Sequence, residues 1–278
     1  MDPVRVAAVQ AAPEPGRIAR NAATAARLVD RAADEGAAVA VLPELFLPAY
    51  HPPTLRADPA ATDLPASADG AIDDGRIDAL RSAARDRSVV VVVGAAVRYE
   101  DGRRTCAAVV VDRSGAAVAA YDKQHLWGPD ENALFTPGTG GATLVVGGWR
   151  FGLGVCYDGC FPEHGRAAAL AGAHGYLVPS GYVVGSAHRR DLYYAARALD
   201  NTMYVVFANA VGGTAPWVFN GGAAVYDPEG RAVVKAADEG EAVVVAALDP
   251  AELSRVRDAH TMLRDRRELG AGRTVIAI

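Results

Sequence analysis

The chain has 278 residues, of which 51% are hydrophobic, and it carries a formal net charge of −5. This length and composition are those of a globular protein with a large core. Acidic and basic residues are interspersed without a basic stripe, so neither nucleic acid nor an anionic membrane surface is an expected partner. The longest apolar run, residues 89–97, is far shorter than the roughly 18–20 residues that cross a bilayer.

The first residues and the cysteines point to the cytoplasm. The opening "MDPVRVAAVQ" lacks the basic and apolar regions of a signal peptide. The three cysteines, Cys106, Cys156 and Cys160, are an odd and sparse set, which is typical of reduced thiols rather than of a disulfide framework. We therefore expect a cytoplasmic protein in which a thiol is available for chemistry.

Apolar runs and helical periodicities predict an α/β fold. Strands are expected where β-branched runs are bounded by turn residues, at 4–10, 38–42, 89–97, 105–111, 116–121, 143–146, 149–155, 175–179, 203–209, 222–226 and 242–248. Helices are expected where apolar residues recur every three or four positions, at 18–35, 72–87, 163–172 and 187–201. The order of these elements favours mixed sheets, and "DRSG" at 112–115 predicts an antiparallel hairpin. Several strands are apolar throughout, which indicates that helices cover one face and a second sheet the other.

The domain organisation follows from the absence of any obvious linker. No Gly/Ser-rich segment or charge block interrupts the chain, so residues 1–278 are expected to form a single domain. The stretch from about residue 261 is polar and then apolar. It is expected either to pack on a partner subunit or to dock on its own chain.

Among the cysteines, Cys156 is the candidate nucleophile. Cys106 lies within an apolar strand, where a thiol behaves as a small hydrophobic side chain. Cys156 follows a strand and precedes Pro162, which suits the first position of a helix. Ligand sites of open α/β sheets lie at such strand ends, and backbone amides there favour a thiolate over a thiol.

A cysteine nucleophile needs a base, and acyl transfer needs positive charge near the developing oxyanion. None of the six histidines lies in a recognisable cysteine-protease context. Glu44 and Lys123, by contrast, each follow an apolar strand directly, and Glu131 lies in the loop after Lys123. Each charge alone could be a solvated loop residue, but together with Cys156 they form a candidate catalytic set. Cys156 and Cys160 lack a suitably spaced Cys or His pair, so no metal site is expected. We expect no cofactor of any other kind either.

With these residues in view, the chain resembles the nitrilase, or carbon–nitrogen hydrolase, superfamily. The resemblance covers nearly the whole chain, and its motifs follow one another in the family's order. The matching positions are residues 6–10, Leu42-Pro43-Glu44, Tyr121, Lys123, His125, Leu126, Gly154, Cys156, Tyr157, Asp158, Phe161, Pro162, Glu163 and residues 196–209.

The resemblance implies a four-layer α-β-β-α sandwich with mixed sheets, usually assembled into a homodimer or larger homo-oligomer. It implies that Cys156 attacks an amide or nitrile carbon to form a thioester acyl-enzyme. Glu44 would be the general base that takes the thiol proton and later activates water.

The resemblance also implies how the oxyanion is held. Lys123 and the backbone N–H of Tyr157 would stabilise the tetrahedral intermediate. Glu131 corresponds to the family's second glutamate, which positions substrate and helps proton transfer, although the neighbouring Asp130 is a rival for that place.

Other residues around the thiol are expected to have structural roles. Asp158 and Glu163 are expected to hold the turn by hydrogen bonds and ion pairs, with Arg166 or Arg197 as partners. His125 is expected to support the site from behind.

Cys160 stands where many relatives carry Arg or another large residue. Its presence would change the pocket's shape or local ion pairing. A disulfide between this second thiol and Cys156 under oxidation is a less favoured alternative.

The residues after the nucleophile bear on the substrate. True nitrilases usually have Trp-Glu there, whereas this chain has Tyr157-Asp158, which is more similar to the amidase and carbamoylase branches. We expect hydrolysis of a small carboxamide to a carboxylic acid and ammonia, with N-carbamoyl and nitrile hydrolysis as alternatives.

A catalytically silent binding or assembly module is a different class of function, which the intact catalytic set disfavours. Substrate contacts are expected from loop residues near the strand ends, namely Tyr50, Trp127, Ser180, Gly181 and Tyr182.

Overall fold

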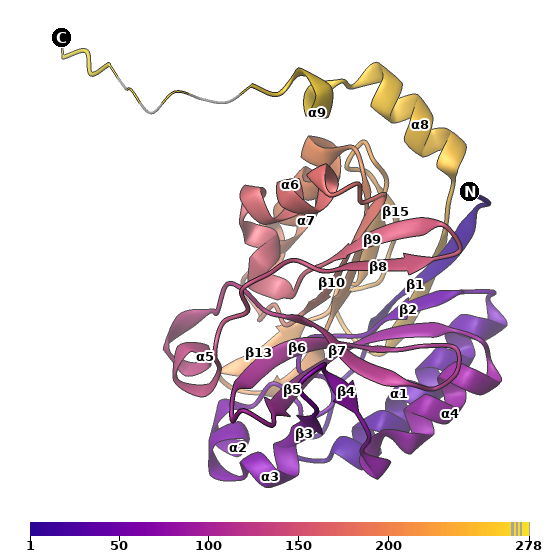
Figure 1. The fold of residues 1–278 in the computed structure, drawn as a ribbon, viewed down its shortest axis with the longest axis vertical. Helices are drawn as coiled ribbons and strands as arrows, with labels where there is room; N and C mark the ends of the chain where they lie inside the picture. Colours follow the sequence, from indigo (N-terminus) through magenta and orange to yellow (C-terminus); the bar gives the residue numbers. More distant parts are fainter. Residues whose placement is uncertain (268–269, 271, 273, 278) are drawn as a thin grey trace.

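A computed structural model of the protein describes residues 1–267, 270, 272 and 274–277 (Figure 1). The expected C-terminal segment from about residue 261 begins with α9 (Met262–Asp265), whose Leu263 packs partly against the α7 side of the molecule. Residues 268, 269, 271, 273 and 278 of that segment lie outside the described residues. None of the described helices is both long and apolar enough to cross a membrane.

The first sheet is mixed and has the strand order β16-β1-β2-β5-β6-β7-β4, with β3 paired to β5. Strands β1, β2 and β5 are parallel, whereas β5, β6 and β7 form antiparallel pairs, as the hairpin signal predicted. The strands of this sheet are β1 (Val4–Gln10), β2 (Val39–Val41), β3 (Asp63–Ala66), β4 (Ala71–Ile72), β5 (Val90–Tyr99), β6 (Arg104–Val111), β7 (Ala117–Asp122) and β16 (Ala242–Leu248).

The second sheet has the order β15-β14-β11-β10-β9-β8, in which β9, β10 and β11 are parallel. Its strands are β8 (Thr143–Val146), β9 (Trp149–Leu153), β10 (Gly175–Ser180), β11 (Tyr204–Asn209), β14 (Ala224–Tyr226) and β15 (Ala232–Lys235). A separate antiparallel pair consists of β12 (Val211–Thr214) and β13 (Trp217–Asn220).

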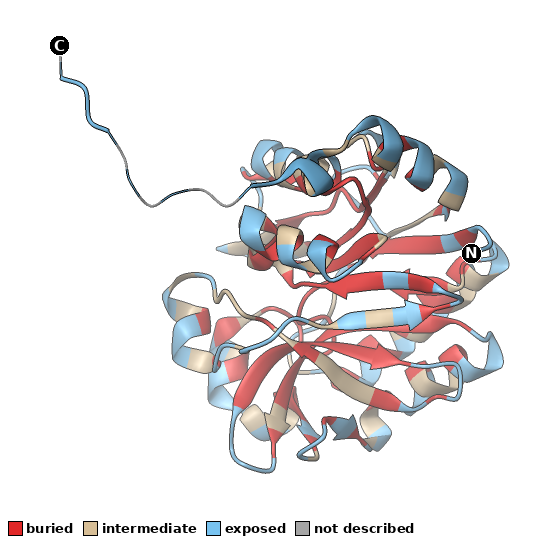
Figure 2. Ribbon diagram, turned by 45° about the horizontal axis from the view of Figure 1, so that its top comes forward, coloured by how far each residue is buried: buried red, intermediate tan, exposed pale blue. Residues whose placement is uncertain are grey.

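The two sheets face each other and are covered by helices on their outer faces, which makes a four-layer α-β-β-α sandwich. Alternation along β1 shows the layering: Val6 and Ala8 belong to the core between the sheets, whereas Ala7 and Val9 pack toward the helices. The first sheet is covered by α1 (Ile18–Asp34) and α4 (Asp78–Asp86), and the second by α6 (Pro162–Leu170) and α7 (Ala187–Asn201). Figure 2 shows buried strands between helices whose outer sides are exposed. The expected fold class is therefore correct.

Several short elements escaped the sequence patterns. The helix expected at 72–87 begins only at Asp78, because residues 71–72 pair with β7 as β4 and residues 75–77 form a 3₁₀ turn. The remaining helical elements, none of which was expected, are α2 (Pro52–Ala57), α3 (Pro59–Thr62), α5 (Gly128–Leu134), α8 (Pro250–Ala259), α9 and a 3₁₀ helix at Cys156–Cys160. Most are too short to show a periodicity.

Candidate active site

Strand ends from both sheets place the four candidate catalytic residues together. Glu44 follows β2, Lys123 follows β7 and Cys156 follows β9, while Glu131 lies in the first turn of α5. Glu44, Glu131 and Cys156 line one cavity, and Lys123 lies hydrogen-bonded beneath it. The residues that the sequence analysis grouped as a candidate catalytic set are thus close together in the structure.

The turn that carries Glu44 packs directly on β5. Gly94 donates its N–H to the carbonyl of Pro43, and its own carbonyl accepts from the N–H of Leu47. A Cβ atom at Gly94 would lie 2.5 Å from the Cα of Glu44, closer than real Cβ contacts allow. Leu45 also has a positive φ of 46°. The position of Glu44 therefore depends on a bare backbone at Gly94.

Lys123 is the centre of a buried ionic cluster. Its Nζ lies 2.6 Å from Oε1 of Glu44, and 2.9 and 2.7 Å from the two carboxylate oxygens of Glu131. All three side chains are at most 2% exposed. Burial by itself lowers the pKa of Lys123, but the carboxylates of Glu131 and Glu44 outweigh it and hold that pKa well above its usual value. The ammonium is therefore charged whenever the protein is folded at neutral pH.

Both carboxylate oxygens of Glu131 accept further hydrogen bonds. Its Oε1 accepts from the hydroxyl of Tyr50 at 2.7 Å, and its Oε2 accepts from the backbone N–H of Trp127 at 2.8 Å. Asp130, the rival for its place, instead has a side chain that is 40% exposed and pairs with Arg56 at 3.1 Å. The geometry therefore puts Glu131, and not Asp130, in the cluster.

Glu44 keeps one oxygen free for a proton. Its Oε1 accepts from Lys123 and from the thiol of Cys106 at 3.7 Å, whereas its buried Oε2 has no hydrogen-bond partner among the described residues. That Oε2 faces Gly181, where an added Cβ would lie 3.0 Å away. Burial raises the pKa of Glu44 to about 7, against the opposing pull of Lys123 and with help from Glu131. A carboxylate with a pKa near neutrality and an open lone pair is suited to act as a general base.

Cys156 begins the 3₁₀ helix after β9 in a strained conformation. Its φ of 44° is uncommon for a residue with a side chain. The hydroxyl of Tyr194 donates to its carbonyl at 2.9 Å, which helps to hold this turn. Burial, followed by the negative charge of Glu44, raises the pKa of the Cys156 thiol well above its usual value. The resting thiol is therefore protonated and requires a base before it can attack.

Asp158 ties the nucleophile turn to the loop after β7. One carboxylate oxygen accepts from the N–H of Val155 at 3.0 Å and the hydroxyl of Tyr121 at 2.7 Å. The other accepts from the N–H of His125 at 2.9 Å and lies 2.8 Å from its Nδ1. His125 thus supports the site from behind, as expected.

The expected arginine partners of this turn are wrong. Neither Asp158 nor Glu163 pairs with Arg166 or Arg197 among the described residues, and Glu163 is exposed. Arg197 instead lies 3.7 Å from Asp200 on the same helix. The hydroxyl of Tyr121, the imidazole of His125 and two backbone N–H groups satisfy Asp158 without an arginine.

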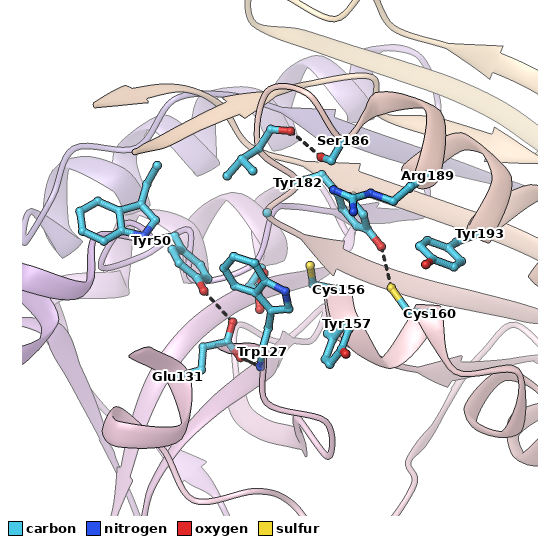
Figure 3. A pocket seen from close by; sticks show the side chains of 14 residues that line it. Tyr50, Trp127, Glu131, Cys156, Tyr157, Cys160, Tyr182, Ser186, Arg189 and Tyr193 are labelled. Carbon is cyan, nitrogen blue, oxygen red and sulfur yellow. Dashed lines mark hydrogen bonds between the residues drawn. The ribbon is translucent and has the colours of Figure 1, made fainter. Parts of the chain in front are cut away.

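The cavity above the cluster has a volume of about 180 Å³ and a largely aromatic wall (Figure 3). Four of the five expected substrate contacts line it, namely Tyr50, Trp127, Gly181 and Tyr182, together with Tyr157. Ser180 does not line the cavity, because its side chain is fully buried and bonded to the carbonyl of Val178 and the hydroxyl of Tyr194. We therefore do not expect the side chain of Ser180 to contact substrate.

Further lining residues carried no signal in the sequence. Ser186, Arg189 and Tyr193 come from α7 and the turn before it, and Trp217 comes from β13. They reach the cavity only through the packing of α7 and of the β12–β13 hairpin. No local pattern distinguishes them from surface residues.

Cys160 is half-buried, and it also lines the cavity. Its Sγ lies 3.1 Å from the hydroxyl of Tyr182, and all three cysteines are free thiols. Of the consequences expected from Cys160, the geometry supports an influence on pocket shape. No group of three His, Cys, Asp or Glu side chains that could hold a metal ion occurs in the described part of the chain.

Comparisons with known proteins agree with this geometry. The family model for carbon–nitrogen hydrolases matches residues 5–258. An (R)-stereoselective amidase from a Pseudomonas species is 37% identical over 70% of each chain, and human omega-amidase NIT2 is 29% identical over 89% of each.

Solved structures of the amidase from Nesterenkonia sp. AN1 share the fold. One of them, a mutant of that enzyme with acrylamide added at its active-site cysteine, has a TM-score of 0.80 and 30% identity, covering 95% of this chain and 96% of the other. The chain is therefore a carbon–nitrogen hydrolase of the nitrilase superfamily, with the fold of that superfamily's amidases.

Proposed function

We propose that the protein hydrolyses a small carboxamide to a carboxylic acid and ammonia through a thioester on Cys156. One observation carries this proposal: the thiol opens into a small cavity beside Glu44, which has a free buried oxygen, and Lys123, which is held charged. A candidate base and a positive charge beside the thiol support acyl transfer at Cys156. The amidases among the similar proteins support the same substrate class.

The first half of the reaction forms the acyl-enzyme. Glu44 takes the proton of the Cys156 thiol, and the thiolate attacks the amide carbon. The Lys123 ammonium and the backbone N–H of Tyr157 stabilise the tetrahedral oxyanion, which in a water-poor site is far more effective than in water. The C–N bond then breaks, and the leaving nitrogen takes the proton from Glu44 to depart as ammonia.

The second half releases the acid. Glu44, now a carboxylate again, takes a proton from water as the water attacks the thioester carbon. The C–S bond breaks, the thiolate regains the proton, and the carboxylic acid leaves. Glu131 positions Lys123 throughout and links it to Tyr50 on the cavity wall.

The test is ammonia release from matched amides, N-carbamoyl amino acids and nitriles, together with mass spectrometry of the protein. We expect amides to react fastest and the acyl group to appear on the peptide that contains Cys156. Cys156→Ala is the inactive comparison and Cys160→Ala the control. Acylation that is lost in Cys160→Ala but kept in Cys156→Ala would contradict the assignment, and acylation by no compound of the panel would contradict the proposed function.

We further propose that the protein acts as a homodimer or larger homo-oligomer. The outer side of α6 and α7 exposes Leu170, Leu192 and Leu199, which are 49%, 68% and 42% exposed. Leu192 and Leu199 are two helical turns apart and so share one face of α7, and exposed apolar side chains of this kind are typical of an interface between subunits. Light scattering with Leu192→Glu tests this, because a charge there would yield monomers.

We also propose that the enzyme acts in the cytoplasm, where free thiols such as these persist.

A further inference from the structure

Two consecutive arginines at the start of α7 have opposite surroundings. Arg190 is fully buried, and its guanidinium donates to the carbonyls of Asn220 and Gly221 and to the carboxylate of Asp238. Arg189 is exposed, and its guanidinium makes no hydrogen bond or ion pair with any other residue that the structure describes. Arg190 therefore serves the fold, whereas the fold makes no use of the charge of Arg189.

Arg189 nevertheless lines the cavity that holds Cys156. Figure 3 shows its side chain extending from α7 past Tyr182 toward the cavity. The residues that line this side of the cavity carry no charge apart from Arg189 itself, and Tyr193 and Trp217 are among them. A cation in such a wall is exposed enough to remain hydrated, yet close enough to contact a bound molecule.

The acids of the cavity do not neutralise this charge. Glu44 and Glu131 both bond to Lys123, and Figure 3 shows Glu131 across the cavity from Arg189. The cavity thus has a buried ionic cluster beside Cys156. At its solvent-exposed edge lies the guanidinium of Arg189, which has no counter-ion among the described residues. A molecule that complements both ends carries its amide at one end and an anionic group at the other.

We propose that Arg189 determines specificity by binding a carboxylate at the end of the substrate remote from its amide. This rests on the proposed function, since it takes the amide carbon to lie at Cys156. The guanidinium presents paired N–H donors that match a carboxylate, and such charge-assisted bonds are about twice as strong as neutral ones. The preferred substrates are accordingly monoamides of linear dicarboxylic acids.

The test compares amides that differ only in the charge of the remote end. Succinamate, glutaramate and adipamate are measured beside butanamide and pentanamide, with 4-aminobutanamide as the cationic member. We expect wild-type kcat/KM to be highest for an anionic amide of one chain length, which reports the span between Cys156 and Arg189. Salt should weaken this preference, because the arginine is exposed.

Substitution assigns the preference to Arg189. In Arg189→Gln the ratio of kcat/KM for the best anionic amide to that for its neutral match should fall by about 10- to 100-fold, chiefly through KM. Arg189→Lys should keep part of the ratio, and Arg189→Glu should favour the cationic amide. Arg20→Gln, in an arginine of α1 whose side chain is 73% exposed, is the matched control and should leave the ratio unchanged. Thermal unfolding of each variant separates these effects from a loss of folding.

Failure of this inference differs from failure of the proposed function. A wild-type enzyme that acylates Cys156 with neutral amides, and whose charge preference is unchanged in Arg189→Gln, overturns only the role of Arg189. Absence of acylation by every amide overturns the proposed function and, with it, the substrate class. Binding of glutaramate and pentanamide to Cys156→Ala, measured by calorimetry, gives the charge preference without chemistry. Equal affinities there would contradict the inference.

Discussion

The two sides of the active site differ in how their reactive groups are held. On the side of the first sheet, Glu44 and Lys123 follow strands β2 and β7 and Glu131 lies on α5, and both glutamates bond to Lys123 in a cluster that is at most 2% exposed. On the second sheet, Cys156 has a strained backbone and opens into the cavity. The charges are thus fixed before substrate arrives, whereas the nucleophile is presented to it. The buried cluster around Lys123 therefore supplies electrostatic preorganisation, whereas the turn after β9 gives the substrate access to the nucleophile.

The difference has an energetic consequence. Removing one member of a buried ionic cluster leaves its partners charged and unpaired, which typically costs about 3–5 kcal/mol. Removing a thiol that faces a cavity leaves no unpaired charge. Substitutions on the first side should therefore affect folding and catalysis together, and those on the second side catalysis alone.

Cys156→Ala should have the largest effect on activity, with a loss of roughly 10⁴- to 10⁶-fold, because no nucleophile remains. The free energy of unfolding should change by less than about 1 kcal/mol, since a small side chain at a cavity wall is replaced by another small one. Ammonia release and urea denaturation measure the two quantities. A marked loss of stability would contradict the contrast between the two sides.

Glu44→Gln should lower the acylation rate by roughly 10²- to 10⁴-fold, because the amide cannot take the thiol proton. In the wild type, activity should rise as pH increases through about 7, since Glu44 must be deprotonated to act as the base and its pKa is about 7. This acid limb should vanish from the residual activity of Glu44→Gln. Glu14→Gln, in an exposed glutamate that pairs with Arg20, should keep the wild-type profile.

Lys123→Met should lower kcat/KM by roughly 10²- to 10³-fold through loss of oxyanion stabilisation. It should also destabilise the fold by about 3–5 kcal/mol, because Glu44 and Glu131 then share a buried site without a cation. Urea denaturation of Lys123→Met and of the double variant Lys123→Met/Glu131→Gln provides the check. If the double variant is no more stable than the single one, the buried carboxylate pair is not the cause.

Cys160→Ala should have the smallest effect, a change of a few-fold at most in kcat/KM. The thiol lies 3.1 Å from the hydroxyl of Tyr182, so its loss frees one cavity-wall group without exposing a charge. We expect stability within about 1 kcal/mol of the wild type. Steady-state kinetics on amides of increasing bulk measures the effect, and a 100-fold loss on all of them would show that Cys160 is needed for the chemistry itself.

Much of the fold and the positions of three catalytic residues were predictable, because local sequence patterns indicate them. The long apolar strands, the helices at 18–35 and 187–201 and the hairpin at 112–115 produce periodicities or turn signals that depend on few distant contacts. Glu44, Lys123 and Cys156 stood out since each puts a reactive group directly after a buried strand. Parallel strands then bring such ends to one edge of a sheet.

What escaped prediction depends on packing between distant segments. Arg189 resembles any helical surface residue until α7 packs beside the cavity. Ser180 and Gly181 are neighbours in the sequence, yet only Gly181 lines the cavity, because alternate residues of an extended chain face opposite ways. The free oxygen of Glu44 likewise becomes visible only when its surroundings are known.

Gly94 is a position at which this enzyme is sensitive to substitution, although it would not be found by a search for reactive groups. The residue carries no functional atom, yet its backbone supports the turn that holds Glu44. In a library of random variants, even Gly94→Ala should appear among the inactive clones alongside substitutions of the catalytic set. Attempts to evolve new substrate preferences will therefore find more freedom around the cavity mouth than in the middle of β5.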